Sequence, residues 1–552
     1  MNYLEKILST LKRASSQAVL QEVRNGELYS VSGNDLLGLC TTARIFLKRT
    51  GIRKSERCVL LASNSIHWTA MDLALMAEGI VTVPLYSRQA PAELVVMIKD
   101  SEPSLIIYGS KELRSGISKQ WSSAPRSAIL EEIFQIPNPA ELAAGMQGPA
   151  PLASSDPVAI IYTSGTSGET KGVILTVGNL NHMLKCTTSR LDLLMGNHAG
   201  PEKVFHYLPC SFAGSWISLL SYLSRNSVLT LSTDLSKLLE EMRLAAPEYF
   251  LNVPALLERV RTGIGNKMKE KGGLSLRLFV NATKAWYRRT EHKETLLDLF
   301  WLALGRAFMF PLIRKSFGQN LKALICGSAP LPLETQLFFQ MLGLPVLQVY
   351  GLTETTAICT MDDPRHIVPG RVGPAIDGIE MKIGESGEIL VRGPNIFTGY
   401  WNKPTAIAEV LRDGWFHTGD TGEHDESGNW IISGRIKDLL ILNSGHNIAP
   451  EPIEEILSRA LNSAMQVVLV GNGRSYMIAI VTGSVSSSEI ETVISSLNQK
   501  MPHYKRIRGF YIAPEPFTME NGLLTANGKL KRDSILKCFQ QEVDALYQQS
   551  KL

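Results

Sequence analysis

The 552-residue chain is predicted to fold as an α/β protein with several structural units. Near the N-terminus, two segments with helical spacing of apolar residues, 34–50 and 65–78, alternate with short β-branched runs at 57–61 and 79–84. Such alternation is typical of βα units around a parallel sheet. Because domains average roughly 150 residues, a chain of this length indicates three or four units.

The same pattern continues along the chain. Leu4, Ile7, Leu8 and Leu11 predict an initial amphipathic helix rather than a signal peptide. Farther on, 92–99 is predicted to be a helix and 104–108 a buried strand, and we expect 110–155 to be a variable, loop-rich connection. No fixed-period repeat occurs in the sequence, so solenoids and coiled coils are excluded.

The overall composition is that of a globular protein, for which we expect a cytoplasmic location. Hydrophobic residues make up 44% and charged residues 20%, which excludes disordered, collagen-like and multi-span membrane classes. The net charge is only +4, so no overall field predicts a nucleic-acid partner. Seven cysteines, none in a CxxC or zinc-ligand spacing, are expected to be reduced and mostly buried.

One segment departs from this even charge distribution. Residues 258–315 contain thirteen basic and five acidic residues beside an apolar run at 296–313. Asp298 and Arg306 interrupt that run, which falls short of the ~20 apolar residues of a membrane span. A solvated helical face is the favoured interpretation. Peripheral contact with an anionic membrane is the alternative.

The strongest local signal is a glycine-rich loop after the apolar strand ending at Tyr162. Glycines permit close approach of the backbone, while successive N–H groups and hydroxyls supply donors for a polyphosphate. The loop lacks Walker A spacing, and a flexible linker is the weaker alternative. Its candidate phosphate-binding residues are Thr163, Ser164, Gly165, Thr166, Ser167, Gly168, Thr170 and Lys171.

Two further clusters contain side chains that could bind a nucleotide. After an apolar run, Tyr350 could stack on a base and Glu354 could hold Mg²⁺ at the carboxyl end of a strand. Gly351 and Thr353 belong to the same cluster. In a later segment, Asp420 and Arg435 are predicted to bind the ribose, since a carboxylate accepts both sugar hydroxyls and a guanidinium donates to them.

Taken together, these motifs resemble the adenylate-forming superfamily of acyl-CoA synthetases, luciferases and peptide-synthetase adenylation domains. YTSGTSGETKG is similar to its phosphate loop, YGLTET to its magnesium and adenine motif, and HTGD with GRIKD to its ribose and hinge motifs. LTANGKLKR is similar to its mobile-lysine motif, which contains Lys529. The adenine-side segment corresponds to Gly327, Ser328, Ala329 and Pro330.

The resemblance implies a large, multi-subdomain N-terminal adenylation domain, 1–435, and a small, mobile α+β C-terminal domain, 436–552. Lys529, Glu354 and Lys171 would be catalytic, and Thr163 would join Glu354 at the metal. The C-terminal domain would rotate about Lys437 and bring Gly445 to a pantetheine channel.

Within the superfamily, the segments 83–91, 259–314 and 441–454 most resemble long-chain fatty-acyl-CoA synthetases. Phe212 stands where relatives commonly have histidine, which would remove a hydrogen bond near the acyl carboxylate. Trp216 falls where some relatives have a tryptophan that gates the acyl tunnel. For both aromatics, core packing is the alternative.

The implied activity is activation of a long-chain fatty acid through acyl-AMP and its transfer to coenzyme A, with ATP and Mg²⁺. Three alternatives remain at this point: transfer to an acyl carrier protein, a different final reaction as in luciferases, and a non-catalytic nucleotide-binding scaffold on membranes. The intact motif set counts against the scaffold. A homodimer is compatible with the sequence.

Overall fold

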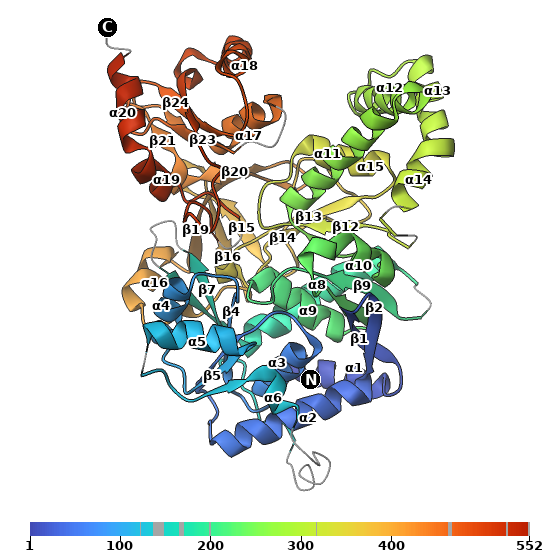
Figure 1. The fold of residues 1–552 in the computed structure, drawn as a ribbon, viewed down its shortest axis with the longest axis vertical. Coiled ribbons are helices and arrows are strands. Elements are labelled where there is room, and N and C mark those ends of the chain that lie inside the picture. Colours follow the sequence, from blue (N-terminus) through green and yellow to red (C-terminus); the bar gives the residue numbers. More distant parts are fainter. Residues whose placement is uncertain are drawn as a thin grey trace.

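The computed structural model describes residues 1–552 except 122, 136–147, 165–169, 198–199, 316, 319, 462–465, 526–527 and 550–552. A large body formed by the N-terminal four-fifths of the chain carries a smaller C-terminal unit at one end (Figure 1). The α/β fold class predicted from the sequence is confirmed.

The first half of the body is built around a seven-stranded sheet with the order β17-β8-β7-β4-β3-β5-β6. Its β4–β7, β3–β4, β3–β5 and β5–β6 pairs are parallel, whereas β7 and β8 form an antiparallel hairpin. The strands are β3 Arg57–Leu61, β4 Val81–Leu85, β5 Leu105–Tyr108, β6 Ser127–Ile129, β7 Pro157–Ser164, β8 Thr170–Thr176 and β17 Gly399–Tyr400.

Helices connect these strands as the periodicity predicts. Asn2 and Glu5 form a capping box at the start of the first helix, and Ser32 with Asp35 does the same at the second. The third helix is buried on nearly every face because it lies between other elements. The helices are α1 Tyr3–Arg13, α2 Gly33–Thr50, α3 Ile66–Ala77, α4 Pro91–Ser101, α5 Lys111–Gln120 and α6 Leu130–Ile133.

The expectation that 110–155 is a loop-rich connection is wrong in part. The segment contains α5, β6 and α6, and β6 forms the edge of the sheet by pairing with β5. A three-residue strand carries almost no periodicity, so its pairing depends on the exposed edge of β5 rather than on a local signal.

Two shorter sheets continue the body. One has the order β2-β1-β10-β9, and a bridge between Val204 and Tyr249 links it toward a sheet of order β11-β12-β13-β14. The elements are β1 Ala18–Arg24, β2 Glu27–Ser32, α8 Val177–Met195, β9 Glu202–His206, α9 Ala213–Leu223, β10 Ser227–Leu231, α10 Leu238–Ala245, β11 Leu251–Asn252, β12 Leu324–Cys326, α15 Leu333–Met341, β13 Val346–Tyr350, the 3₁₀ turn η3 Thr353–Thr355 and β14 Thr360–Met361.

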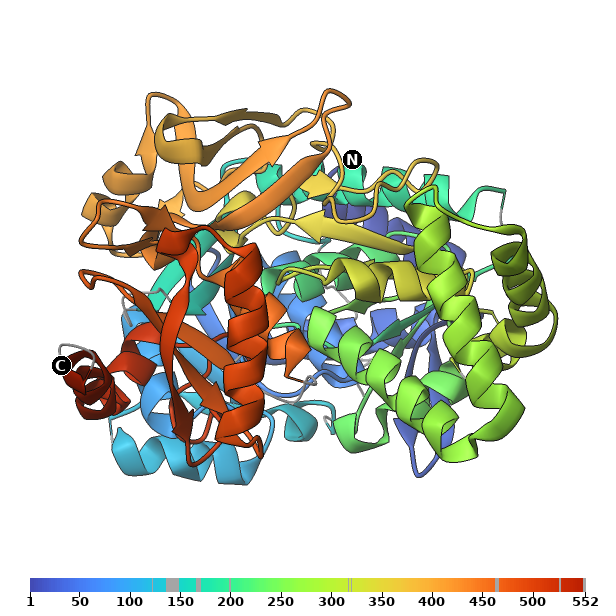
Figure 2. The same cartoon turned by 90° about the horizontal axis from the view of Figure 1, so that it is seen from above.

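Between β11 and β12 the chain leaves the body as a helical projection, which lies at the upper right of Figure 1 and at the right of Figure 2. It consists of α11 Pro254–Lys271, α12 Gly273–Thr290, α13 Leu296–Leu304, the π-helical stretch η2 Gly305–Met309 and α14 Phe310–Lys315. By length and composition alone, the continuous helix Leu296–Lys315 could cross a membrane. From the sequence, we expect the apolar run at 296–313 to be too short for that. A third of its apolar window is buried in the protein.

The remaining chain forms a five-stranded antiparallel sheet and the C-terminal unit. The former contains β15 Glu380–Ile383, β16 Glu388–Arg392, α16 Pro404–Val410, β18 Leu411–Arg412, β19 Trp415–His424 and β20 Trp430–Arg435. After the turn η5 Ile436–Asp438, the unit contains β21 Leu440–Ile441, β22 Asn447–Ile448, α17 Glu451–Ala460, β23 Val467–Val470, β24 Met477–Thr482, α18 Ser487–Lys500, β25 Ile507–Ala513, α19 Arg532–Cys538 and α20 Gln540–Gln549. It has its own apolar core around β23, β24 and β25.

Candidate active site

The candidate site begins at the β7–β8 hairpin. Thr163 is in register with Lys171, and Ser164 with Thr170, so the last two residue pairs of the hairpin lie where its connecting loop starts. The predicted loop residues Gly165, Thr166, Ser167 and Gly168 lie outside the described residues. The hairpin therefore places a hydroxyl and an ammonium group opposite one another at the base of the predicted phosphate loop.

A tyrosine connects this hairpin to the predicted metal ligand. The Lys171 ammonium lies 5.0 Å from the centre of the Tyr400 ring, and the Tyr400 hydroxyl donates a 2.8 Å hydrogen bond to Glu354 Oε1. Burial, followed by the charge of Glu354, raises the pKa of Tyr400, so the phenol stays protonated as a donor. The sequence interpretation did not include Tyr400 among the site residues, because a two-residue strand such as β17 has no pattern of its own.

The predicted ribose residues also meet. The Tyr350 hydroxyl donates to Asp420 Oδ2 at 2.8 Å, and Arg435 Nε lies 2.8 Å from Asp420 Oδ1. Antiparallel pairing of β19 with β20 places Asp420 directly opposite Arg435. Asp420 is buried, which raises the pKa of its carboxyl, while Arg435, Tyr350 and Lys529 favour the charged form.

Lys529 reaches the same cluster from the C-terminal unit. Its pKa is lowered first by removal of water around the ammonium and then by the nearby Arg435, while Asp420, Asp438 and Glu354 oppose the shift. Part of the Lys529 residue remains exposed to solvent. Asp438, which the sequence interpretation did not assign, supplies part of the negative charge.

Two ion pairs hold the loop that carries Lys529. Lys531 pairs with Glu93 of α4 at 3.2 Å, which ties the C-terminal unit to the body. Next to it, the Arg532 guanidinium donates two hydrogen bonds, of 2.7 and 2.6 Å, to the Glu454 carboxylate on α17. The conformation described is therefore one in which Lys529 faces the body.

Backbone geometry explains the glycines of the predicted adenine side. A Cβ on Gly327 would approach Val349 Cγ2 to 2.5 Å, and one on Gly351 would approach the Ala357 carbonyl oxygen to 2.3 Å. Ser328 has a left-handed φ of 73°, an uncommon conformation for a side-chain-bearing residue. Ser328, Ala329 and Pro330 are exposed beyond β12, and Thr353 begins η3, beside Glu354.

The donors around Glu354 fit a magnesium ion that arrives with a nucleotide. Among the described residues, no group of three or more His, Cys, Asp or Glu side chains could hold a metal by itself. Mg²⁺ usually keeps its waters and binds through one or two carboxylates together with substrate phosphates. Glu354 has one oxygen engaged by Tyr400, and its second oxygen and the Thr163 hydroxyl suit that kind of binding.

Four other predicted residues lie elsewhere. Phe212 precedes α9, with its ring 5.8 Å from that of Tyr86. Lys437 is exposed in η5, and Gly445 has a left-handed φ of 78° in the turn between β21 and β22. Trp216 is fully buried in the main apolar core, where its indole N–H donates to Asp72 Oδ2 at 2.7 Å.

The gating role of Trp216 stays a prediction. If the ring closes the acyl tunnel until ATP binds, Trp216→Ala should admit fatty acid without nucleotide, which calorimetry would detect. Because removing so large a buried ring leaves a cavity, Trp216→Phe is the variant to compare if Trp216→Ala fails to fold. Unchanged ATP dependence of fatty-acid binding in a folded variant would identify Trp216 as a core residue.

The Asp72 carboxyl beneath Trp216 gives a prediction about stability and pH. Burial raises the pKa of Asp72 to about 7, and the Trp216 hydrogen bond opposes the shift. Since the unfolded chain ionises near pH 4, the Asp72 contribution to stability is complete below that pH and declines as the pH rises to about 7. We expect Asp72→Asn to gain in melting temperature relative to wild type between about pH 5 and pH 8. A difference in melting temperature that is constant across that range would contradict this assignment.

Comparison with known proteins agrees with the geometry. The AMP-binding enzyme family matches residues 12–401, and the AMP-binding enzyme C-terminal domain matches residues 437–551. The chain is 28% identical to the long-chain-fatty-acid–CoA ligase FadD15 of Mycobacterium tuberculosis over 575 residues, covering 96% of this chain and 94% of that protein. It is also 28% identical to the long-chain-fatty-acid–[acyl-carrier-protein] ligase AEE15 of Arabidopsis thaliana, covering 91% and 80%.

Solved structures show the same fold. The O-succinylbenzoate coenzyme A synthetase MenE of Bacillus subtilis, in complex with AMP, superposes with a TM-score of 0.74 at 19% identity, covering 96% of this chain and 97% of that one. The same protein has been solved with ATP and a magnesium ion. Because the two family models together match most of its length, the chain belongs to the AMP-binding enzyme family. It is therefore an ATP-dependent ligase of the acyl-adenylate-forming type.

Proposed function

We propose that the chain activates a long-chain fatty acid with ATP, in the cytoplasm, and transfers the acyl group to coenzyme A. The observation that carries this proposal is that the loop of Lys529 is tied to the body by the 3.2 Å pair of Lys531 with Glu93, which brings Lys529 within range of the charges of Asp420, Arg435 and Glu354. The fatty-acid specificity is supported by the names of the relatives FadD15 and AEE15.

In the first half-reaction, a fatty-acid carboxylate oxygen attacks the α-phosphorus of ATP. A P–O bond to the acyl group forms as the P–O bond to pyrophosphate breaks, which leaves acyl-AMP. No general base is needed, because a carboxylic acid is already ionised at neutral pH. Since two anions must approach each other, the protein must supply positive charge and donors placed in advance, which is the role of Lys171 and Lys529.

The other residues of the cluster bind the nucleotide. Asp420, held between Tyr350 and Arg435, accepts from the ribose hydroxyls, and the exposed segment Ser328, Ala329 and Pro330 lies on the adenine side. Glu354 and Thr163 would hold Mg²⁺, which neutralises phosphate charge when bound. Tyr400 orients the Glu354 carboxylate through its hydrogen bond.

In the second half-reaction, the C-terminal unit rotates about Lys437, which withdraws Lys529 and brings the Gly445 turn to the acyl-AMP. The coenzyme A thiol sulfur then attacks the acyl carbon. A C–S bond forms, the C–O bond to AMP breaks, and the thiol proton is released. One site thereby serves two steps in succession.

Transfer to a carrier protein is the second candidate, favoured by the printed activity of AEE15. The deciding experiment measures pyrophosphate release over a series of fatty acids from short to long chain, and thioester formation with coenzyme A or a holo acyl carrier protein. We expect release that depends on long-chain acids and a thioester with coenzyme A. Equal pyrophosphate release with acids of every chain length would reject a long-chain fatty acid as the specific substrate. A thioester formed with the carrier protein alone would reject coenzyme A as the acceptor.

A further inference from the structure

The helical projection exposes a continuous apolar surface. Along the helix Leu296–Lys315, the exposed fractions are 86% for Leu296, 66% for Phe308 and 71% for Leu312. We call this surface the apolar stripe; its large exposed members are Leu296, Leu297, Leu299, Phe300, Phe308 and Leu312. Exposed apolar side chains that lie next to one another on a helix indicate a surface that binds a membrane or another protein.

The opposite face of the same helix is fixed to the rest of the protein. Leu302, Met309, Phe310 and Ile313 are buried, the last three in the apolar core that also contains residues of β12 and α15. Asp298 is buried as well, and it caps the helix while pairing with Arg288 of α12. Crossing a bilayer would expose all these groups to lipid, so the helix suits the surface of a membrane rather than its interior.

Basic side chains surround the stripe. Residues 258–315 contain thirteen basic and five acidic residues, whereas the whole chain has a net charge of only +4. Lys284, Arg289, Arg306 and Lys315 are exposed and make no ion pair within the described part of the chain. Near an anionic lipid surface, each such cation attracts the protein to the bilayer, and added salt weakens that attraction.

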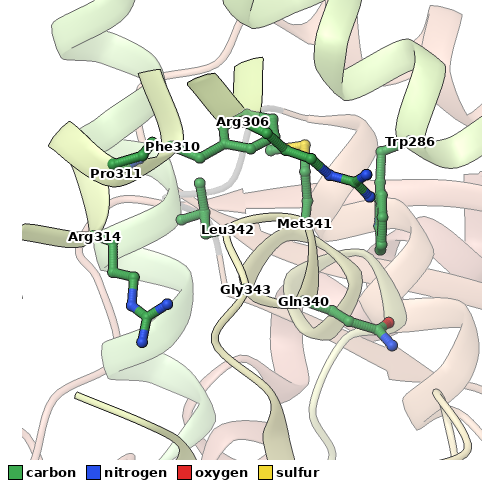
Figure 3. A pocket seen from close by; sticks show the side chains of 9 residues that line it. All are labelled: Trp286, Arg306, Phe310, Pro311, Arg314, Gln340, Met341, Leu342 and Gly343. Atoms are coloured by element: carbon green, nitrogen blue, oxygen red, sulfur yellow. The ribbon is translucent and has the colours of Figure 1, made fainter. Parts of the chain in front are cut away.

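A hollow of about 350 Å³ opens beside the stripe (Figure 3). Arg306, Phe310, Pro311 and Arg314 line it from the helix Leu296–Lys315, and Trp286 lines it from α12. Figure 3 shows the two guanidinium groups on either side of apolar side chains. The hollow combines cations with apolar walls, the pattern that fits a lipid headgroup and the start of its acyl chains.

We propose that the apolar stripe and its basic surroundings dock the protein peripherally on a bilayer that contains anionic phospholipid. The helix lies in the plane of the interface, with its buried face still packed on the body. Figure 1 shows the projection at the upper right and the C-terminal unit at the upper left of the same end of the body.

The test is co-flotation of the full chain with vesicles of phosphatidylcholine alone or mixed with phosphatidylglycerol. We expect wild type to bind the mixed vesicles, and salt to weaken the binding. Leu296→Glu/Phe308→Glu should lower the apparent partition coefficient by about tenfold or more, because two charges enter the contacting surface. Val96→Glu/Leu193→Glu is the matched control, since both side chains are exposed apolar residues on α4 and α8.

The outcomes separate the competing explanations. Equal binding of wild type and the stripe variant, or no preference for anionic vesicles, would overturn the proposal. Resistance of the bound protein to an alkaline carbonate wash would show a spanning helix instead. If light scattering shows a wild-type dimer that Leu296→Glu/Phe308→Glu dissociates, while vesicles do not bind, the stripe is covered by a second copy of the chain. Pyrophosphate release with a soluble acid should be unchanged in both double variants.

Discussion

Lys529→Ala should slow acyl-AMP formation by about 10² to 10³, the usual loss when one preorganised donor to a developing negative charge is removed. Lys529 lies where the charges of Asp420 and Glu354 act on it, and it would meet the reacting oxygens between carboxylate and α-phosphate. Thioester formation from acyl-AMP should be spared, because rotation about Lys437 carries the lysine away before that step.

The measurement supplies presynthesised acyl-AMP with coenzyme A to the variant and compares thioester yield with that of wild type. Lys537→Ala on α19 is the matched control, an exposed lysine of the same unit. Equal loss of rate in both half-reactions of the Lys529 variant would contradict domain alternation. No loss of rate in either half-reaction would show that Lys529 is not an active-site residue.

The pH profile gives the same hypothesis a second measurement. Since its surroundings lower the pKa of Lys529, its proton is lost at a lower pH than that of a free lysine. Adenylation should therefore decline as the pH rises into the alkaline range. In Lys529→Arg the guanidinium keeps its charge, so any remaining adenylation should lack that decline.

Asp420→Ala should raise the Michaelis constant for ATP by about 10- to 150-fold, corresponding to about 1.5 to 3 kcal/mol for hydrogen bonds to a buried charged group. Asp420 is 4% exposed and positioned by Tyr350 and Arg435, so the variant loses a charged ribose acceptor that is held in place in advance. Turnover at saturating ATP should change less, because the ribose does not react.

Steady-state kinetics over a range of ATP concentrations test this expectation, after circular dichroism has confirmed folding. Glu423→Ala is the control, because Glu423 is an exposed carboxylate three residues along the same strand, β19. An unchanged Michaelis constant in folded Asp420→Ala would reject the ribose assignment.

The sequence by itself determined the features that depend only on residues close together in the chain. The strand at 57–61 and the helices at 34–50 and 65–78 appear as β3, α2 and α3 because their apolar spacing matches the period of each element. The motif residues Lys171, Glu354, Asp420, Arg435 and Lys529 could be selected for the same reason, since each lies in a short segment whose residue types suit one chemical task.

The tertiary structure alone decided which groups meet. Tyr400 joins Lys171 to Glu354 because β17 pairs with β8 more than 220 residues away in sequence. The position of β6 at the sheet edge likewise depends on β5 being available. The helix Leu296–Lys315 illustrates the reason: periodicity predicts that one face of a helix is apolar, but the same pattern serves a core, a membrane surface or a partner. Only the arrangement of the other elements decides which face is covered and which, like the apolar stripe, stays exposed.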